Sequence, residues 1–183
     1  TKLTYQLDTD KMFYISYDKG FKSGGVNREF GACGLAPTAP CLTAAQATWQ
    51  PETSYNYELG MKSEWLDNRL RLNVTLFHQE YEDFQVTENI LGEANVVVTN
   101  AAEVVADGVE GELVWVATDL LTLNGNFTWA QVEYDKFDTA PCAFSTQPGC
   151  VGGKLNLTGE QLDHAPELSF TLGAELRDSF DMI

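Results

Sequence analysis

The chain lacks any long run of apolar residues, although 44% of its 183 residues are hydrophobic. A transmembrane helix needs about 20 consecutive apolar residues, so the sequence excludes one. Cations are also scarce, because 11 lysines and arginines stand against 27 aspartates and glutamates, which gives a net charge of -16. A surface this acidic repels a phosphate backbone, and we therefore expect no nucleic-acid partner.

Histidine is rarer still, since the sequence has only His78 and His164. His164 stands shortly before Pro166, and we interpret it as a loop residue. No nucleophile–base pattern is present. The glycine-rich stretch GFKSGG at 20–25 lacks the lysine–threonine ending of a phosphate-binding loop, so it indicates a turn. Glu80, Glu82 and Asp83 form an acidic cluster that could bind a cation, but a solvated strand end is the better interpretation. We predict no enzyme, no cofactor and no metal site.

Apolar and polar residues alternate over long stretches. Between Tyr55 and Trp65 the apolar residues fall on odd positions, and after the short segment LDNR the alternation resumes from Leu70 to Leu76. A period of two over this length predicts β-strands with one apolar and one polar face. A soluble sheet would turn the apolar face towards a core, whereas a membrane barrel would turn it towards lipid.

Seven such strands are predicted, and their connections alternate between two kinds. The tight turns are DTDK, LDNR and TDL, whose Asp and Asn side chains suit short reversals. The long links cover about 23–52, 88–95 and 138–165, and all of them fall at the same rim of the sheet. The predicted strands cover about 3–7, 13–22, 53–65, 69–86, 96–117, 121–129 and 168–177.

Short turns at one rim and long loops at the other are typical of outer-membrane barrels. The strands also reach the 9–11 residues that cross a bilayer, and aromatic residues gather near their ends. We therefore predict an all-β fold: an antiparallel up-and-down transmembrane β-barrel, present as an incomplete arc of about seven strands. A soluble β-sandwich, whose strands also alternate, is the alternative. In 69–86 the apolar phase shifts after Leu76, which indicates either a bulge or a strand that projects above the membrane.

The individual facing of the side chains follows from the same alternation. We expect a lipid-facing set and a lumen-facing set on the last two strands. The lipid-facing set is Leu121, Leu123, Phe127, Trp129, Leu168, Phe170 and Leu172, and the lumen-facing set is Asn124, Asn126, Thr171 and Glu175.

The four cysteines form two pairs with the same spacing. Seven residues separate Cys33 from Cys41, and seven separate Cys142 from Cys150. A zinc site would need a different spacing and nearby histidines, so we predict two local disulfides. Disulfides place the chain in an oxidising compartment, such as the periplasm or the cell surface.

Four runs of sequence resemble the C-terminal barrel region of TonB-dependent outer-membrane receptors. They are YISYDKGFKSGGVN (14–27), PETSYNYELGMKSEWLDNRLRLNVTLFHQEYEDFQV (51–86), NAAEVVADGVEGELVWVATDLLTLNGNFTWAQVEYDKF (100–137) and LTGEQLDHAPELSFTLGAELR (157–177). The resemblance rests on their succession in the family's order rather than on any one run. It implies a 22-stranded barrel of the bacterial outer membrane whose lumen holds a plug domain.

Such receptors bind scarce nutrients, such as ferric siderophores or cobalamin, and import them with energy from the inner-membrane TonB complex. The chain begins within a strand, KLTYQL, and stops at DSFDMI, so we expect residues 1–183 to be a partial barrel domain. The plug domain, the TonB-contacting motif and the C-terminal strands would then lie outside it. The resemblance implies a nutrient receptor; a passive porin or adhesion barrel and a soluble β-domain that binds carbohydrate or protein are the other hypotheses.

Overall fold

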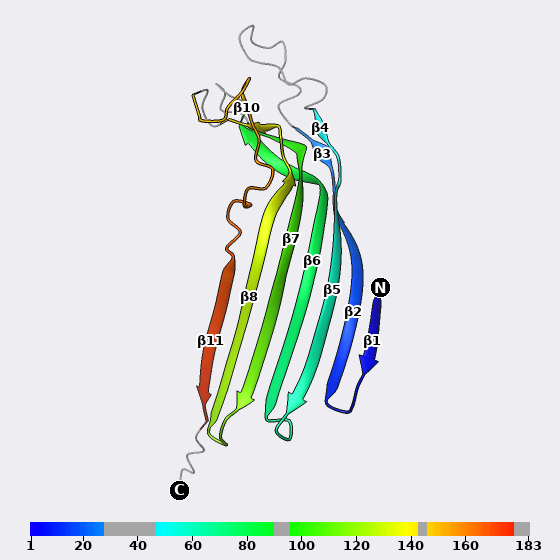
Figure 1. The fold of residues 1–183 in the computed structure, drawn as a ribbon, viewed down its shortest axis with the longest axis vertical. Coiled ribbons are helices and arrows are strands. Elements are labelled where there is room, and N and C mark those ends of the chain that lie inside the picture. Colours follow the sequence, from blue (N-terminus) through cyan, green and yellow to red (C-terminus); the bar gives the residue numbers. More distant parts are fainter. Residues whose placement is uncertain (28–46, 90–95, 143–145, 178–183) are drawn as a thin grey trace.

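The computed structural model describes residues 1–27, 47–89, 96–142 and 146–177. Its main element is one antiparallel sheet in which each strand pairs with the next long strand along the chain (Figure 1). In spatial order the strands are β1 (Lys2–Gln6), β2 (Lys11–Lys22), β5 (Glu52–Trp65), β6 (Leu70–Asn89), β7 (Val96–Val116), β8 (Leu121–Lys136) and β11 (Leu168–Leu176).

The prediction of an all-β, up-and-down sheet of seven strands is confirmed. The described residues contain no helix with the length and apolar character needed to cross a membrane. Two small ladders lie within the long links, and the sequence did not indicate them. They pair β3 (Gly25–Val26) with β4 (Thr48–Trp49), and β9 (Ala140–Pro141) with β10 (Lys154–Leu155).

The tight turns lie together at the lower end of the sheet in Figure 1, and the short strands β3, β4 and β10, which belong to the long links, lie at the upper end. Polar side chains shape these turns as the sequence predicts. Asp8 accepts a hydrogen bond from the Asp10 amide at 2.9 Å, and Thr118 accepts one from the Leu121 amide at 3.0 Å. In the β5–β6 turn, Asp67 and Asn68 have φ angles of 55° and 65°, a left-handed conformation that Asp and Asn tolerate better than most residues.

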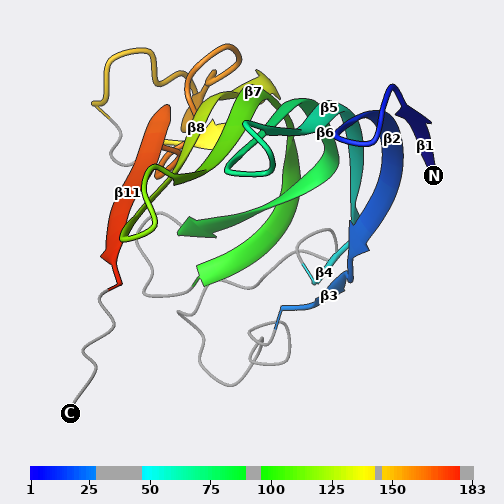
Figure 2. The same ribbon diagram turned by 90° about the horizontal axis from the view of Figure 1, so that it is seen from below.

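The sheet is an arc rather than a flat layer (Figure 2). Side chains on its two faces differ in exposure. On β2, Tyr14 and Ser16 are buried, whereas their neighbours Phe13, Ile15 and Tyr17 are exposed. Side chains crowd together on the concave side of a curved sheet and splay apart on the convex side. The face that carries Tyr14 and Ser16 is therefore the concave one, and the face with Phe13 and Ile15 is convex.

A bulge in β6 accounts for the phase shift in the sequence. The β6–β7 register shifts between Tyr81 and Phe84, and Asp83 adopts a φ angle of 54°. The two intervening residues return Phe84 to the same face as Tyr81, and the two rings meet edge to face with centroids 6.0 Å apart. Beyond the bulge, β6 continues to Asn89 and its partner β7 begins at Val96. These two strands therefore project well past β5 and β8.

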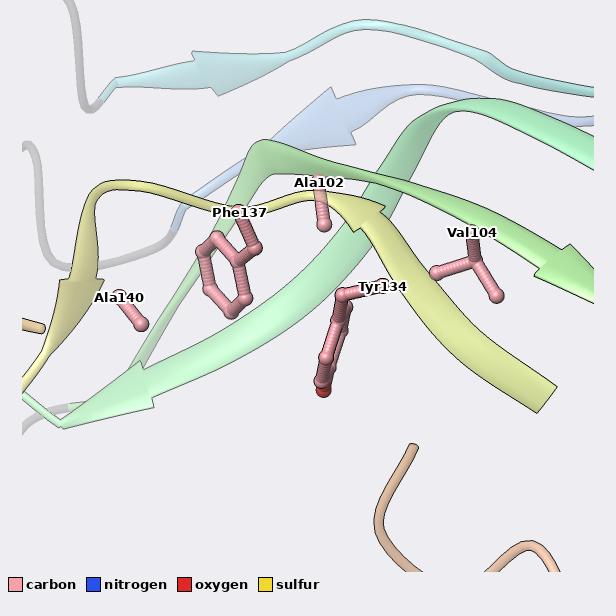
Figure 3. Close-up of a cluster of buried hydrophobic side chains, with 5 residues drawn as sticks. All are labelled: Ala102, Val104, Tyr134, Phe137 and Ala140. Atoms are coloured by element: carbon pink, nitrogen blue, oxygen red, sulfur yellow. The ribbon is translucent and has the colours of Figure 1, made fainter. Parts of the chain in front are cut away.

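The buried apolar cluster of the described chain sits at the upper end, above the middle of the sheet. It consists of Ala102, Val104, Tyr134, Phe137 and Ala140 (Figure 3). The link between β8 and β11 packs against it and is held by backbone hydrogen bonds from Leu157 to Phe137 and from Gly159 to Tyr134, both 2.7 Å. Burial raises the pKa of the Tyr134 hydroxyl. Because of these hydrogen bonds and this packing, the described residues of the link are an ordered part of the fold.

Candidate functional site

The convex face carries rows of apolar side chains that run across the whole sheet. Their exposed fractions reach 70% at Leu3 and 58% at Leu168. The strand registers define two adjacent rows, which we call the apolar belt. The first row is Leu3, Ile15, Leu59, Leu76, Val109, Trp129 and Leu168, and the second is Tyr5, Phe13, Met61, Val74, Gly111, Phe127 and Phe170.

Every strand of the sheet contributes to both rows. A monomeric soluble protein rarely leaves a continuous apolar surface of this kind uncovered. Gly111 is the one gap in the second row, and the ring of Phe127 on the next strand lies over it in the space that a Cβ would occupy. The apolar belt therefore has no gap between β1 and β11, and it requires an apolar medium or partner.

Aromatic residues border the apolar belt on the side of the long links. The rings of Tyr17 and Tyr57 are tilted against each other with centroids 5.2 Å apart, and the ring of His78 follows at 5.9 Å from Tyr57. His78 Nδ1 lies 2.7 Å from a carboxylate oxygen of Asp107, and Nε2 lies 3.3 Å from one of Glu80. Polar groups thus begin on the convex face directly past the first row of the belt.

A second aromatic border lies at the tight-turn end. The Lys11 ammonium sits 4.4 Å from the centroid of the Trp65 ring. The Trp65 indole donates a hydrogen bond to Ser63 Oγ at 2.9 Å, and Ser63 in turn donates one to the Leu72 carbonyl at 2.7 Å. Ser63 is only 1% exposed, so its hydroxyl is both covered and satisfied. Amphipathic rings at both edges of an apolar band are what a membrane-spanning sheet has at its two interfaces.

The concave face is polar, and its side chains bond across strands. The Glu58 carboxylate accepts hydrogen bonds from Asn56 at 2.8 Å and from Ser16 at 3.3 Å. Asn73 donates to Glu112 at 2.9 Å on the neighbouring strand. These carboxylates and amides are already oriented by their partners, and they form a wall suited to water or to a polar segment of protein.

The structure places the predicted site residues in two groups. Cys142 and Cys150 are joined by a disulfide, with their Cα atoms 5.9 Å apart, and the paired strands β9 and β10 flank the loop that it closes. This is the pairing that the spacing predicts. Cys33 and Cys41 lie outside the described residues, so their disulfide stays a prediction.

The other candidates are separate from one another. His164 lies in the link before β11 with a φ angle of 63°. Glu80 and Glu82 follow the convex-face border on β6, and Asp83 forms the bulge. No group of three or more His, Cys, Asp or Glu in the described part of the chain is arranged to hold a metal ion.

Comparison with protein families identifies the fold. Residues 1–181 match the family model described as TonB dependent receptor-like, beta-barrel. The chain belongs to the TonB-dependent receptor β-barrel family. This confirms the resemblance in the sequence and leaves the soluble-sandwich alternative without support. TonB-dependent receptors are outer-membrane transporters rather than enzymes, so the predicted location is confirmed as well.

Two curated relatives are siderophore receptors by name. The probable TonB-dependent siderophore receptor PiuA of Acinetobacter baumannii is 24% identical over 174 residues, which are 93% of this chain and 21% of PiuA. The ferric-pyoverdine M114 receptor PbuA of a Pseudomonas strain is 29% identical over 99 residues, which are 54% of this chain and 12% of PbuA. The chain thus spans about a fifth or less of the length of these relatives.

Solved structures show the same fold. The ferric yersiniabactin receptor FyuA of Yersinia pestis matches with a TM-score of 0.65 and 21% identity over 98% of this chain and 23% of FyuA. The ferric-catecholate receptor Fiu of Escherichia coli matches with a TM-score of 0.59 and 21% identity, over 98% of this chain and 22% of Fiu. In a TonB-dependent receptor barrel, the apolar belt faces lipid, the concave face lines the lumen, and the long links are extracellular.

The sequence located the faces of the strands but missed one feature of the extracellular end. Asn27, Gln85 and Asn100 connect segments that are far apart in the chain. Their only sequence signal is that amide side chains stand close to predicted strand ends, which is common in loops.

Proposed function

We propose that this chain is part of the barrel of an outer-membrane receptor that takes up a ferric siderophore with energy from the TonB complex. The proposal extends to the whole protein, in which a plug domain and further C-terminal strands accompany residues 1–183. The observation that carries it is the family match over nearly the whole chain together with relatives named as siderophore receptors.

Each surface of the sheet has a part in this function. The apolar belt and its two aromatic borders anchor the arc in the outer membrane. The polar concave face, with Glu58 and Glu112 held by neighbouring amides, receives the plug domain. The described parts of the extracellular links form part of the entrance through which a ferric siderophore reaches the plug.

Siderophore uptake is favoured over cobalamin uptake by the names of the relatives, which refer to a siderophore and to ferric pyoverdine. A passive porin would conduct without energy, and an adhesion barrel would bind a partner without transport. These alternatives differ from the proposal in one property, which is dependence on TonB.

The experiment uses the full-length protein in a Gram-negative host that lacks its own siderophore receptors. Radioactive ferric pyoverdine, ferric yersiniabactin and a ferric catecholate are supplied as separate iron sources. We expect uptake of at least one of them, and we expect this uptake to fall to background when the host's tonB gene is deleted. Uptake that persists without TonB would indicate a porin. Radioactive cyanocobalamin is supplied in a parallel assay, and uptake of cyanocobalamin in place of the ferric siderophores would replace the substrate class.

A further inference from the structure

The side chain of Asn100 joins three segments at the extracellular end. Its Oδ1 accepts a hydrogen bond from the Gln50 amide at 2.6 Å, and its Nδ2 donates one to the Gln50 carbonyl at 2.9 Å. The side-chain amide thus pairs with residue 50 as a neighbouring strand would. The same Nδ2 also donates to the Asp83 carbonyl at 2.7 Å, in the bulge of β6.

Asn27 makes the same pair of hydrogen bonds with the roles exchanged: its side chain belongs to the β2–β5 link, and the backbone that it pairs with belongs to β7. Its Nδ2 donates to the Val98 carbonyl at 2.9 Å, and its Oδ1 accepts from the Val98 amide at 3.0 Å. Asn27 is 6% exposed, and Val97, which precedes Val98 in the chain, is 1% exposed. A buried amide that already has its partners is costly to separate, because separation leaves polar groups unpaired where little water reaches them.

Gln85 supplies a third connection, from β6. Its backbone amide donates to Glu52 Oε2 at 2.9 Å, and its side chain donates to the Ser23 carbonyl at 3.0 Å and the Gln50 carbonyl at 3.2 Å. Glu52 is 8% exposed, and the Lys22 ammonium lies 3.9 Å from the same carboxylate oxygen. We refer to the side chains of Asn27, Glu52, Gln85 and Asn100 as the hairpin latch.

The hairpin latch acts on the part of the sheet that leans over the lumen. In Figure 2 the far ends of β6 and β7 reach across the concave side, and β3 and β4 lie near them. The hydrogen bonds of the latch tie these ends to both bases of the β2–β5 link, around residues 22–27 and 47–52. The described residues that flank two adjacent extracellular connections are thereby joined to one another.

We propose that Asn27, Glu52, Gln85 and Asn100 are positioning residues that hold the described ends of β6 and β7 as a fixed wall of the extracellular entrance. This rests on the proposed function, in which a ferric siderophore passes this wall. The wall keeps one position before, during and after binding, so that the entrance is formed in advance and binding does not have to order it.

The first test measures the mobility of the wall with and without a ferric siderophore. In the full-length receptor, a spin label is attached to a Thr87→Cys variant, at an exposed position on β6. We expect an immobile label whose spectrum is unchanged by ferric pyoverdine, ferric yersiniabactin or a ferric catecholate. The Gln85→Ala/Asn100→Ala double variant should make the label mobile. The matched control Asn126→Ala, on the lumen face of β8, should leave it immobile.

The second test locks the wall covalently. In the Gln50→Cys/Asn100→Cys variant, the reduced protein has lost the contacts of Asn100, and oxidation replaces them with a disulfide. For a fixed wall, oxidation should retain uptake and should tighten siderophore binding relative to the reduced form. If only about a tenth of the Gln85→Ala/Asn100→Ala molecules hold the wall in the position that binds siderophore, the apparent Kd of this variant for the siderophore should rise about tenfold.

The outcomes separate this proposal from the proposed function. The fixed wall is overturned if the label is mobile in the receptor with an intact hairpin latch, or if the mobility of the label does not change when Gln85 and Asn100 are replaced by alanine. Oxidation that blocks uptake, with recovery on reduction, overturns it as well and shows a moving lid. If none of the three ferric siderophores is transported, the proposed function fails, and the spin-label comparison still decides whether the latch holds the wall.

Discussion

The phenol oxygen of Tyr14 lies 2.9 Å from the hydroxyl oxygen of Thr75, although β5 separates their two strands. The residue between them in the register is Gly60, which pairs with Tyr14 on one side and with Thr75 on the other. The Tyr14 ring occupies the place that a Cβ at position 60 would take. A glycine on the middle strand thus lets an aromatic side chain cross it and bond to the strand beyond.

Replacement of Gly60 by alanine should destabilise the full-length receptor. The added methyl group overlaps the Tyr14 ring, and relief requires a shift of the ring or of the backbone, at a cost of about 1–3 kcal/mol. Urea unfolding of the receptor refolded into liposomes measures the change. In a Tyr14→Ala background the cost of Gly60→Ala should largely disappear, because the ring is no longer there. An equal cost in both backgrounds would contradict this explanation.

The two faces of β8 should differ sharply in their tolerance of charge. Phe127 belongs to the apolar belt and Asn126 faces the lumen, although they are adjacent in the sequence. An arginine at a mid-membrane lipid-facing position costs about 2–4 kcal/mol, and a lumen position tolerates it. We therefore expect Phe127→Arg, but not Asn126→Arg, to impair folding of the full-length protein into liposomes.

Comparable effects of the two arginines would contradict the assigned facing. A matched pair on the neighbouring strand repeats the test, with Phe170→Arg and Thr171→Arg, since Phe170 pairs with Phe127 and Thr171 pairs with Asn126. Agreement between the two strands would exclude an effect that is specific to one position.

The sequence predicted the transmembrane part of this fold well, because alternation reports directly which face each side chain takes. Residues such as Leu59 and Leu76 keep their phase along the strand, and tight turns fix their pairing. The phase shift after Leu76 also located the irregular region, although the sequence left open whether a bulge or a projecting strand caused it. The structure has both, with the bulge at Glu82 and Asp83.

The extracellular end was less predictable for a physical reason. Asn27 bonds to Val98, which is 71 positions away, and Asn100 bonds to Gln50, 50 positions away. No periodicity connects such pairs, and an asparagine near a strand end equally suits an ordinary turn. The two-residue ladder of β3 and β4 is likewise too short to leave a pattern.

The disulfide between Cys142 and Cys150 should stabilise the β8–β11 link locally. A bridge over so few residues contributes about 2–3 kcal/mol in the loop-closure description. The Cys142→Ser/Cys150→Ser variant of the full-length receptor should therefore be cut faster by protease within this link, whereas the transmembrane strands stay protected. Peptide mapping without reductant should recover this bridge and the predicted Cys33–Cys41 bridge. Cross-pairing, or free thiols in exported protein, would contradict the local pairing.

The 183-residue chain, produced alone, should not behave as a soluble protein. Its outer strands, β1 and β11, are exposed along nearly their whole length and have a neighbour on one side only within the described sheet. In lipid each unpaired backbone group costs several kcal/mol, and in water an open edge beside an uncovered apolar belt promotes aggregation. We expect the isolated chain to require detergent and to bind no ferric siderophore, whereas the full-length receptor in the same detergent should do so. A monodisperse, detergent-free monomer that melts cooperatively would contradict the assignment of the convex face to lipid.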